Sequence, residues 1–198
     1  RHLLGVENLM YAYYDDPELL HAIARQWSVL CRGVIDRVVQ THRLTFIQFW
    51  EDMCYKNGPL ISPRHFKEFM SPYYREVTDH ARNRGVENFV VDTDGECTPL
   101  IPLFMDAGVN ALMPFEVQAG MDIRVVRETF GRRLVIFGGL DKRELAKGRA
   151  AIERLVQEKA LPLFRDGGYV PGIDHAVPPD VPLPDFKYFV RLMREMRS

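Results

Sequence analysis

Two carboxylates follow a short apolar run near the middle of the sequence. Phe89, Val90 and Val91 come just before Asp92 and Asp94. A run of this length and composition is too short for a helix and is typical of a strand buried on both faces of a parallel sheet. Residues that follow such a strand lie at the edge where α/β proteins bind ligands. Asp92 and Asp94 are therefore candidate ligands or acid/base groups, unless they cap the next helix and occupy its first turn.

Charged side chains recur at the ends of the other predicted strands. They are, in chain order, Glu51 and Asp52, Glu116, Asp141 and Lys142, and Asp174 and His175. If the strands are parallel, all of these groups face one mouth of the fold. Helix capping explains Asp141 well, but it does not explain Glu51 and Asp52, because a loop separates them from the next helix. Carboxylates crowded at one mouth must be partly protonated, paired with cations or bound to a metal.

One histidine belongs to this set of strand-end residues. His175 is the only one of the six histidines that lies at a predicted strand end. A histidine side chain changes charge near neutral pH, so His175 is a candidate general acid/base or metal ligand. A site of aspartate, glutamate and one histidine suits a divalent cation such as Mg²⁺, Mn²⁺ or Zn²⁺. An acid/base site and a metal site therefore both remain open interpretations.

Alternating strands and helices must position these groups. Helical spacing of apolar residues predicts long helices over residues 17–38 and 63–84, the first with Asp16 as its N-cap. Predicted strands cover residues 44–50, 87–91, 109–115, 134–137 and 169–173, with helices over 98–106, 122–131, 142–164 and from about 185. Such alternation indicates parallel strands with right-handed crossovers. Short units favour a (β/α) barrel over a doubly wound sheet, but five strands do not close the eight-stranded TIM barrel.

Composition limits the setting and the partners. The 198 residues carry a net charge of −1 and suit one domain over residues 1–198, with no general nucleic-acid surface. No apolar run approaches the roughly 20 residues that span a membrane. The three cysteines, Cys31, Cys54 and Cys97, are far apart and odd in number, which favours a reduced, cytoplasmic setting. The start at Arg1 has neither an initiator methionine nor a signal-peptide pattern, so we expect the chain to be part of a longer one.

Several motifs resemble the uroporphyrinogen decarboxylase superfamily. They lie at residues 49–53, 58–63, 72–74, 106–110, 138–142 and 167–180. This superfamily contains uroporphyrinogen decarboxylases and methyltransferases that move methyl groups between corrinoid proteins and thiols. The resemblance runs from Leu4 to the C-terminus and implies the C-terminal five βα units of a distorted TIM (β/α)8-type barrel. It also implies that an N-terminal portion with the first three strands is missing from this chain.

The resemblance assigns roles to individual residues. The decarboxylase histidine at the last strand matches His175, whereas a decarboxylase serine is replaced by Asp52. The zinc ligands of the methyltransferases, a His-x-Cys pair and a final Cys, fall at Asp92 and Asp94 and near His175. Any zinc held by these oxygen ligands is more electrophilic and less suited to a thiolate. The candidate catalytic residues are then Glu51, Asp52 and His175, and the candidate metal ligands are Asp92, Asp94 and His175.

Three functional hypotheses follow. The first is a methyltransferase that uses a divalent metal, zinc by family, and a corrinoid carried by a partner protein. The second is uroporphyrinogen decarboxylation of a tetrapyrrole substrate. The third is a non-catalytic partial barrel, and we expect this chain alone to be inactive. The strands that begin at Leu44 and Tyr169 would leave open sheet edges, which predicts either a homo-oligomer or a substantially rearranged partial barrel.

Overall fold

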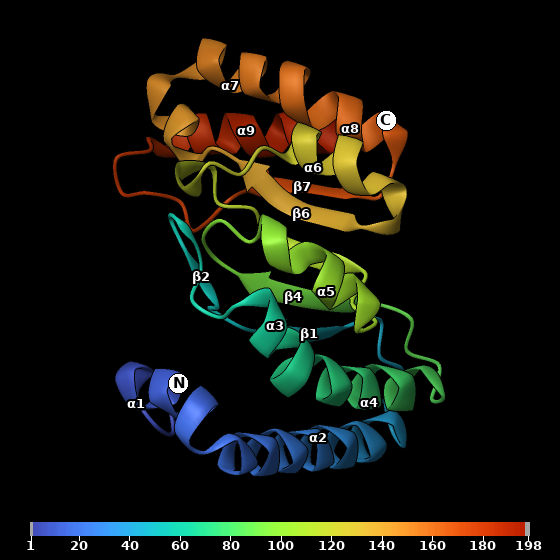
Figure 1. Cartoon of the computed structure of the whole chain (residues 1–198). Helices are drawn as coiled ribbons and strands as arrows, with labels where there is room; N and C mark the ends of the chain where they lie inside the picture. Colours follow the sequence, from blue (N-terminus) through green and yellow to red (C-terminus); the bar gives the residue numbers. More distant parts are fainter. Residues whose placement is uncertain (1, 197–198) are drawn as a thin grey trace. The chain divides into compact units, whose positions relative to one another are not determined.

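The structure, a computed structural model, describes residues 2–196 (Figure 1). Two compact units share this part of the chain. The first, which we call the helical unit, comprises residues 2–47, 61–89 and 99–109. The second, which we call the sheet unit, comprises residues 48–60, 90–98 and 110–196. The single domain expected from the sequence stays a prediction.

One five-stranded sheet carries the strand-end residues. Its strands are β1 (Ile47–Trp50), β4 (Phe89–Thr93), β5 (Ala111–Pro114), β6 (Val135–Leu140) and β7 (Tyr169–Ile173). They pair in the order β1-β4-β5-β6-β7, and the pairings from β4 to β7 are parallel. The predicted α/β class with a parallel sheet is thus confirmed. Strand order follows chain order without reversal, as in a (β/α) barrel rather than a doubly wound sheet.

Strand β6 is longer than the sequence predicts. The predicted strand ended at Phe137, whereas the observed one continues to Leu140. The extension forms because Gly138, Gly139 and Leu140 continue the parallel pairing with residues 171–173 of β7. The glycines weaken the sequence signal for a strand, since they lack side chains that pack on a sheet.

The helices of the sheet unit follow its strands. They are η3 (Val117–Ala119), α6 (Ile123–Phe130), η4 (Gly131–Arg133), η5 (Lys142–Lys147), α7 (Arg149–Leu155), η6 (Val156–Ala160), α8 (Leu161–Asp166) and α9 (Leu183–Glu195). Helix α8 packs on β7 and α7 packs on α9 (Figure 1). The predicted break near Gly148 is confirmed, because Gly148 separates η5 from α7.

The helical unit contains the two long predicted helices. Its elements are α1 (Val6–Asp15), α2 (Pro17–Val39), α3 (Pro63–His65), η1 (Phe66–Met70), α4 (Ser71–Arg82) and α5 (Ile101–Asp106), with η2 (Thr98–Leu100) at its border. The predicted N-cap of α2 is confirmed, since Asp16 accepts a hydrogen bond from the Leu19 N–H at 3.1 Å. The rings of Phe66 and Phe104 meet edge to face in the core, with centroids 4.8 Å apart. Among residues 2–196, no helix combines the length and the apolar character that crossing a membrane requires.

Two predicted helices are interrupted by a π-helical turn. Turn η1 lies just before Pro72 and turn η6 lies just before Pro162. Proline has no N–H to donate, and its ring clashes with the carbonyl group four residues earlier. A wider turn relieves this clash without ending the helix. Proline in a sequence is usually taken to start or end a helix, so these π-helical turns were not predicted.

A short hairpin occupies the stretch that was predicted to be a loop. Strands β2 (Cys54–Tyr55) and β3 (Gly58–Pro59) pair antiparallel, with Tyr55 opposite Gly58. A two-residue connection is the commonest way to join such a pair. Strands of two residues are too short to show a recognisable alternation, so the sequence indicated only the turn.

The N-cap of α6 provides a test of stability. Asp122 accepts a hydrogen bond from the Arg124 N–H at 2.9 Å, and its side chain pairs with the Arg124 guanidinium at 2.7 Å. The hydrogen bonds from Arg124 lower the pKa of Asp122 to about 2. Because the folded pKa lies below the unfolded value of about 3.9, the stabilisation is present above pH 4 and is lost as the pH falls towards 2.

Asp122→Asn is therefore expected to lower the free energy of unfolding by about 1 kcal/mol at pH 7. This value allows for screening of a partly exposed pair. The difference from the wild type should disappear near pH 2. Urea titrations at several pH values measure it, and an equal difference at all pH values would contradict the ionic origin.

Candidate functional site

The carboxyl ends of the parallel strands place the predicted residues at one edge of the sheet. Glu51 and Asp52 follow β1, Asp94 follows β4, Glu116 follows β5, Asp141 follows β6, and Asp174 and His175 follow β7. Asp92 is still part of β4, next to its end. All of these residues belong to the sheet unit. The neighbouring strand ends thus gather acidic groups and one imidazole, as strand order requires.

His175 and Asp94 form the closest pair at this edge. Nε2 of His175 lies 3.1 Å from Oδ1 of Asp94. The side chain of His175 is 25% exposed and that of Asp94 is 46% exposed, so solvent or a substrate can reach the pair. An imidazole held by a partly exposed carboxylate can accept, hold and return a proton.

Asp174 is a fully buried carboxylate beside this pair. Its Oδ2 accepts a hydrogen bond from the Val117 N–H at 3.0 Å, and its Oδ1 accepts one from the Lys142 N–H at 3.2 Å. Oδ2 also lies 3.8 Å from Nδ1 of His175. The two N–H donors offset part of the cost of burying the carboxylate, and they connect the segments after β5 and β6 to the end of β7.

Glu116 holds the segment that carries Asp94. Its Oε2 accepts a hydrogen bond from the Gly95 N–H at 2.9 Å. The residue before it, Phe115, is buried and has a φ of 58°, which is unusual for a residue other than glycine. Backbone strain of this kind persists where the surrounding structure fixes it, often beside functional groups.

Asp92 lies in a different environment from Asp94. Its Oδ2 accepts a hydrogen bond from Gln48 Nε2 at 3.2 Å. The pKa of Asp92 is raised, first by burial and then by the neighbouring charges of Asp94 and Asp52. Asp92 therefore keeps a proton at higher pH than an ordinary aspartate. Sequence reasoning missed Gln48, although an amide within an apolar strand was a usable signal.

The remaining strand-end acids, Glu51, Asp52 and Asp141, each make a different kind of interaction. The backbone N–H of Glu51 donates to the carbonyl oxygen of Asp92 at 2.7 Å, which links the end of β1 to β4. Asp52 acts on Asp92 through its charge. Asp141 caps η5 and pairs with Arg143 at 2.7 Å, so the capping interpretation of Asp141 is confirmed. Catalytic roles for Glu51, Asp52 and His175 stay predictions.

The predicted metal site does not assemble in the described part of the chain. Among residues 2–196, no three side chains of His, Cys, Asp and Glu are grouped as a metal ion requires. His175 faces Asp94, whereas Asp92 is held by Gln48. The donor set in this arrangement does not fit a divalent cation, and the metal site stays a prediction.

The two buried cysteines near this edge are protonated thiols. Burial raises the pKa of Cys54 to about 11 and raises that of Cys97 as well. Both are free, as expected from the sequence for Cys54, Cys97 and Cys31. The thiolate is the form of cysteine that binds metals and reacts. Since Cys54 and Cys97 stay protonated, they act as small apolar residues in the core.

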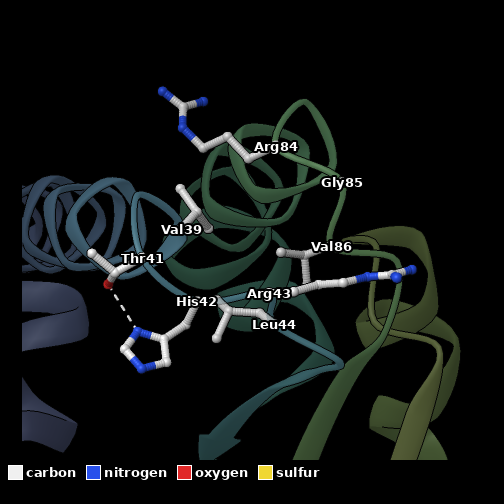
Figure 2. Close-up of a pocket in the computed structure, with 8 residues that line it drawn as sticks. All are labelled: Val39, Thr41, His42, Arg43, Leu44, Arg84, Gly85 and Val86. Carbon is white, nitrogen blue, oxygen red and sulfur yellow. Dashed lines mark hydrogen bonds between the residues drawn. The ribbon is translucent and has the colours of Figure 1, made fainter.

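A separate pocket lies in the helical unit (Figure 2). It is lined by Val39, Thr41, His42, Arg43, Leu44, Arg84, Gly85 and Val86. Figure 2 shows the guanidinium groups of Arg43 and Arg84 pointing outward in different directions. Arg84 pairs with Asp36, and His42 Nδ1 lies 2.8 Å from Thr41 Oγ1. The charged groups do not converge on one point, so the pocket has no assigned ligand.

Comparisons with known proteins point to one family. The model of the family described as uroporphyrinogen decarboxylase (URO-D) matches residues 2–196. The uroporphyrinogen decarboxylase of Campylobacter fetus subsp. fetus (strain 82-40) is 24% identical over 185 residues, which are 92% of this chain and 50% of that protein. The uroporphyrinogen decarboxylase of Sulfurovum sp. (strain NBC37-1) is 22% identical over 179 residues, which are 89% of this chain and 49% of that protein.

A solved structure supports the same fold. A methyltransferase from Methanosarcina mazei superposes with a TM-score of 0.71 at 18% identity, covering 98% of this chain and 54% of that protein. At this identity the likeness shows the fold alone, a TIM-barrel-like partial fold. The chain spans about half the length of the curated relatives it matches.

Proposed function

This chain belongs to the uroporphyrinogen decarboxylase family, and from that premise we propose that the protein carrying it is an enzyme that works by proton transfer at the strand ends. The five strands are then the last five of a (β/α)8 barrel, and the earlier strands come from outside this chain. A homo-oligomer that pairs the edges of β1 and β7 remains an alternative way to cover them.

The pair of His175 and Asp94 carries this proposal. Nε2 and Oδ1 lie 3.1 Å apart at the ends of β7 and β4. An ionised aspartate at this distance orients the imidazole and stabilises its protonated form. Asp92 lies in the same group of acids with a raised pKa, so it is a second group that holds a proton.

Decarboxylation of a tetrapyrrole is the first candidate reaction, supported by the curated relatives. In such a reaction the bond between the carboxylate carbon and its neighbour breaks, and carbon dioxide leaves. The electron pair stays on the remaining carbon, which must receive a proton. In our proposal this proton comes from the partly exposed pair of His175 and Asp94, and solvent then returns a proton to the pair.

Turnover of uroporphyrinogen by the full-length protein tests this function. Asp94→Asn keeps the shape of the side chain but removes its charge, so kcat should fall about tenfold or more. Asp180→Asn is the matched control, because it is the same change at an exposed aspartate in the segment after β7. Wild-type turnover that D94N does not slow, or no turnover of uroporphyrinogen at all, would contradict the proposal.

Methyl transfer with a corrinoid protein as partner is the second candidate, which the resemblance of the sequence motifs to the superfamily implies. In this case Asp92, Asp94 and His175 would have to move from their present positions to hold a divalent metal, zinc by family. Metal analysis of the full-length protein separates the candidates. A stoichiometric metal that is lost in Asp92→Ala and His175→Ala would support methyl transfer, and equal metal contents in all three proteins would exclude this metal role.

A further inference from the structure

A closed ring of contacts surrounds the His175–Asp94 pair in the sheet unit. Asp174, the neighbour of His175 in the chain, accepts the Val117 N–H at 3.0 Å. Glu116, the neighbour of Val117, accepts the Gly95 N–H at 2.9 Å. Asp94, the neighbour of Gly95, returns to His175 at 3.1 Å. Three interactions and three peptide links thus join the segments after β4, β5 and β7.

The two outer carboxylates in this ring receive backbone donors. Asp174 is fully buried and accepts a second N–H, that of Lys142 at 3.2 Å. Glu116 reaches across from the end of β5 to Gly95. A side-chain oxygen that accepts a backbone N–H group fixes the position of a loop, because the hydrogen bond holds its two atoms at a narrow range of distances. Asp94, by contrast, turns its carboxylate to a side chain.

We propose that Glu116 and Asp174 are positioning residues, which hold the segments after β4 and β5 so that Asp94 meets His175. Glu116 therefore works through the reach of its side-chain oxygen and not through a proton of its own. Phe115, with its φ of 58°, directly precedes Glu116, and strained backbone of this kind persists where the surrounding structure fixes it. The expected effect of Glu116 on turnover rests on the proposed function. Its effect on the position of Asp94 does not.

Two substitutions at Glu116 distinguish the length of its side chain from its charge as the cause of the positioning. Glu116→Gln keeps an oxygen at the same distance and removes the charge, so kcat should fall less than about threefold. Glu116→Asp keeps the charge but is shorter by one methylene group, so the bond to the Gly95 N–H at 2.9 Å is lost and kcat should fall about tenfold or more with little change in KM. A general acid or base at this position would give the reverse order. That reverse order, equal losses in both variants, or no loss in either would overturn the proposal.

A second measurement does not need turnover. Long-range ¹H–¹⁵N spectra detect signals from the two ring nitrogens of His175. These signals are assigned because they are missing from the spectrum of His175→Gln. Asp94→Asn should shift these signals in an otherwise wild-type chain and in the E116Q background. In the E116D background the same substitution should have little effect, because Asp94 has already moved away. Equal shifts in all three backgrounds would overturn the proposal. If the shifts follow the expected pattern but the protein does not decarboxylate uroporphyrinogen, the positioning role of Glu116 holds and the proposed function fails.

Discussion

His175→Gln in the full-length protein is expected to lower kcat about 10²- to 10⁴-fold, the range that general acid/base catalysis contributes. His175 is the only histidine that directly follows a strand in the described part of the chain, and its Nε2 is held by Asp94 at 3.1 Å. Glutamine has a similar polar side chain but carries no titratable proton. KM should change little, because the proton moves only in the transition state. Steady-state kinetics measures both constants.

His80→Gln provides the matched control for this experiment. His80 also pairs with an aspartate, since its Nε2 lies 2.9 Å from Oδ1 of Asp36. This pair belongs to the helical unit and is remote from the strand ends in the sequence. We expect H80Q to keep kcat within about threefold of the wild type. Equal losses in H175Q and H80Q would mean that the fold, and not proton transfer, was disturbed.

Gly95→Ala should cause a large loss of stability for a local reason. A Cβ at Gly95 would lie 2.6 Å from the backbone nitrogen of Tyr55 and 2.7 Å from the carbonyl carbon of Cys54. Gly95 also has a φ of 81°, which disfavours alanine. Strain and overpacking against backbone together should lower the free energy of unfolding by about 2–4 kcal/mol. Urea titration of both proteins measures this difference.

Gly120→Ala separates the two causes. Gly120 has a φ of 95°, but a Cβ there would meet no atom within 4 Å. This variant therefore reports strain alone and should cost about 1–2 kcal/mol. If G95A and G120A cost the same, close packing of the Asp94 segment on β2 contributes nothing, and that part of the account is wrong.

Strand-end reasoning predicted which residues lie at the carboxyl ends of the strands, but not which of them pair. The valine and phenylalanine run at residues 89–91 identified β4, and the parallel arrangement placed His175 near the acids. The sequence did not distinguish Asp94 from Asp92, because their difference depends on where β4 ends. Asp92 remains in the strand and meets Gln48 of β1, whereas Asp94 lies beyond it and meets His175.

Long-range backbone contacts explain what the sequence missed. Asp174 was recognised only as one more acid at a strand end. Its burial depends on N–H groups of Val117 and Lys142, which are far from it in the sequence and show no residue-specific signal. The β2–β3 hairpin and the π-helical turns escaped prediction for a related reason, since each is too local to alter hydrophobic periodicity.

A double-mutant cycle between His175 and Asp94 tests the central claim most directly. The quantity measured is kcat/KM of the full-length protein with single and combined substitutions H175Q and D94N. If Asp94 acts through His175, the double variant should be no slower than H175Q alone. Losses that multiply, so that the double variant is slower by the product of the two single effects, would show that the two residues act independently and would contradict the account.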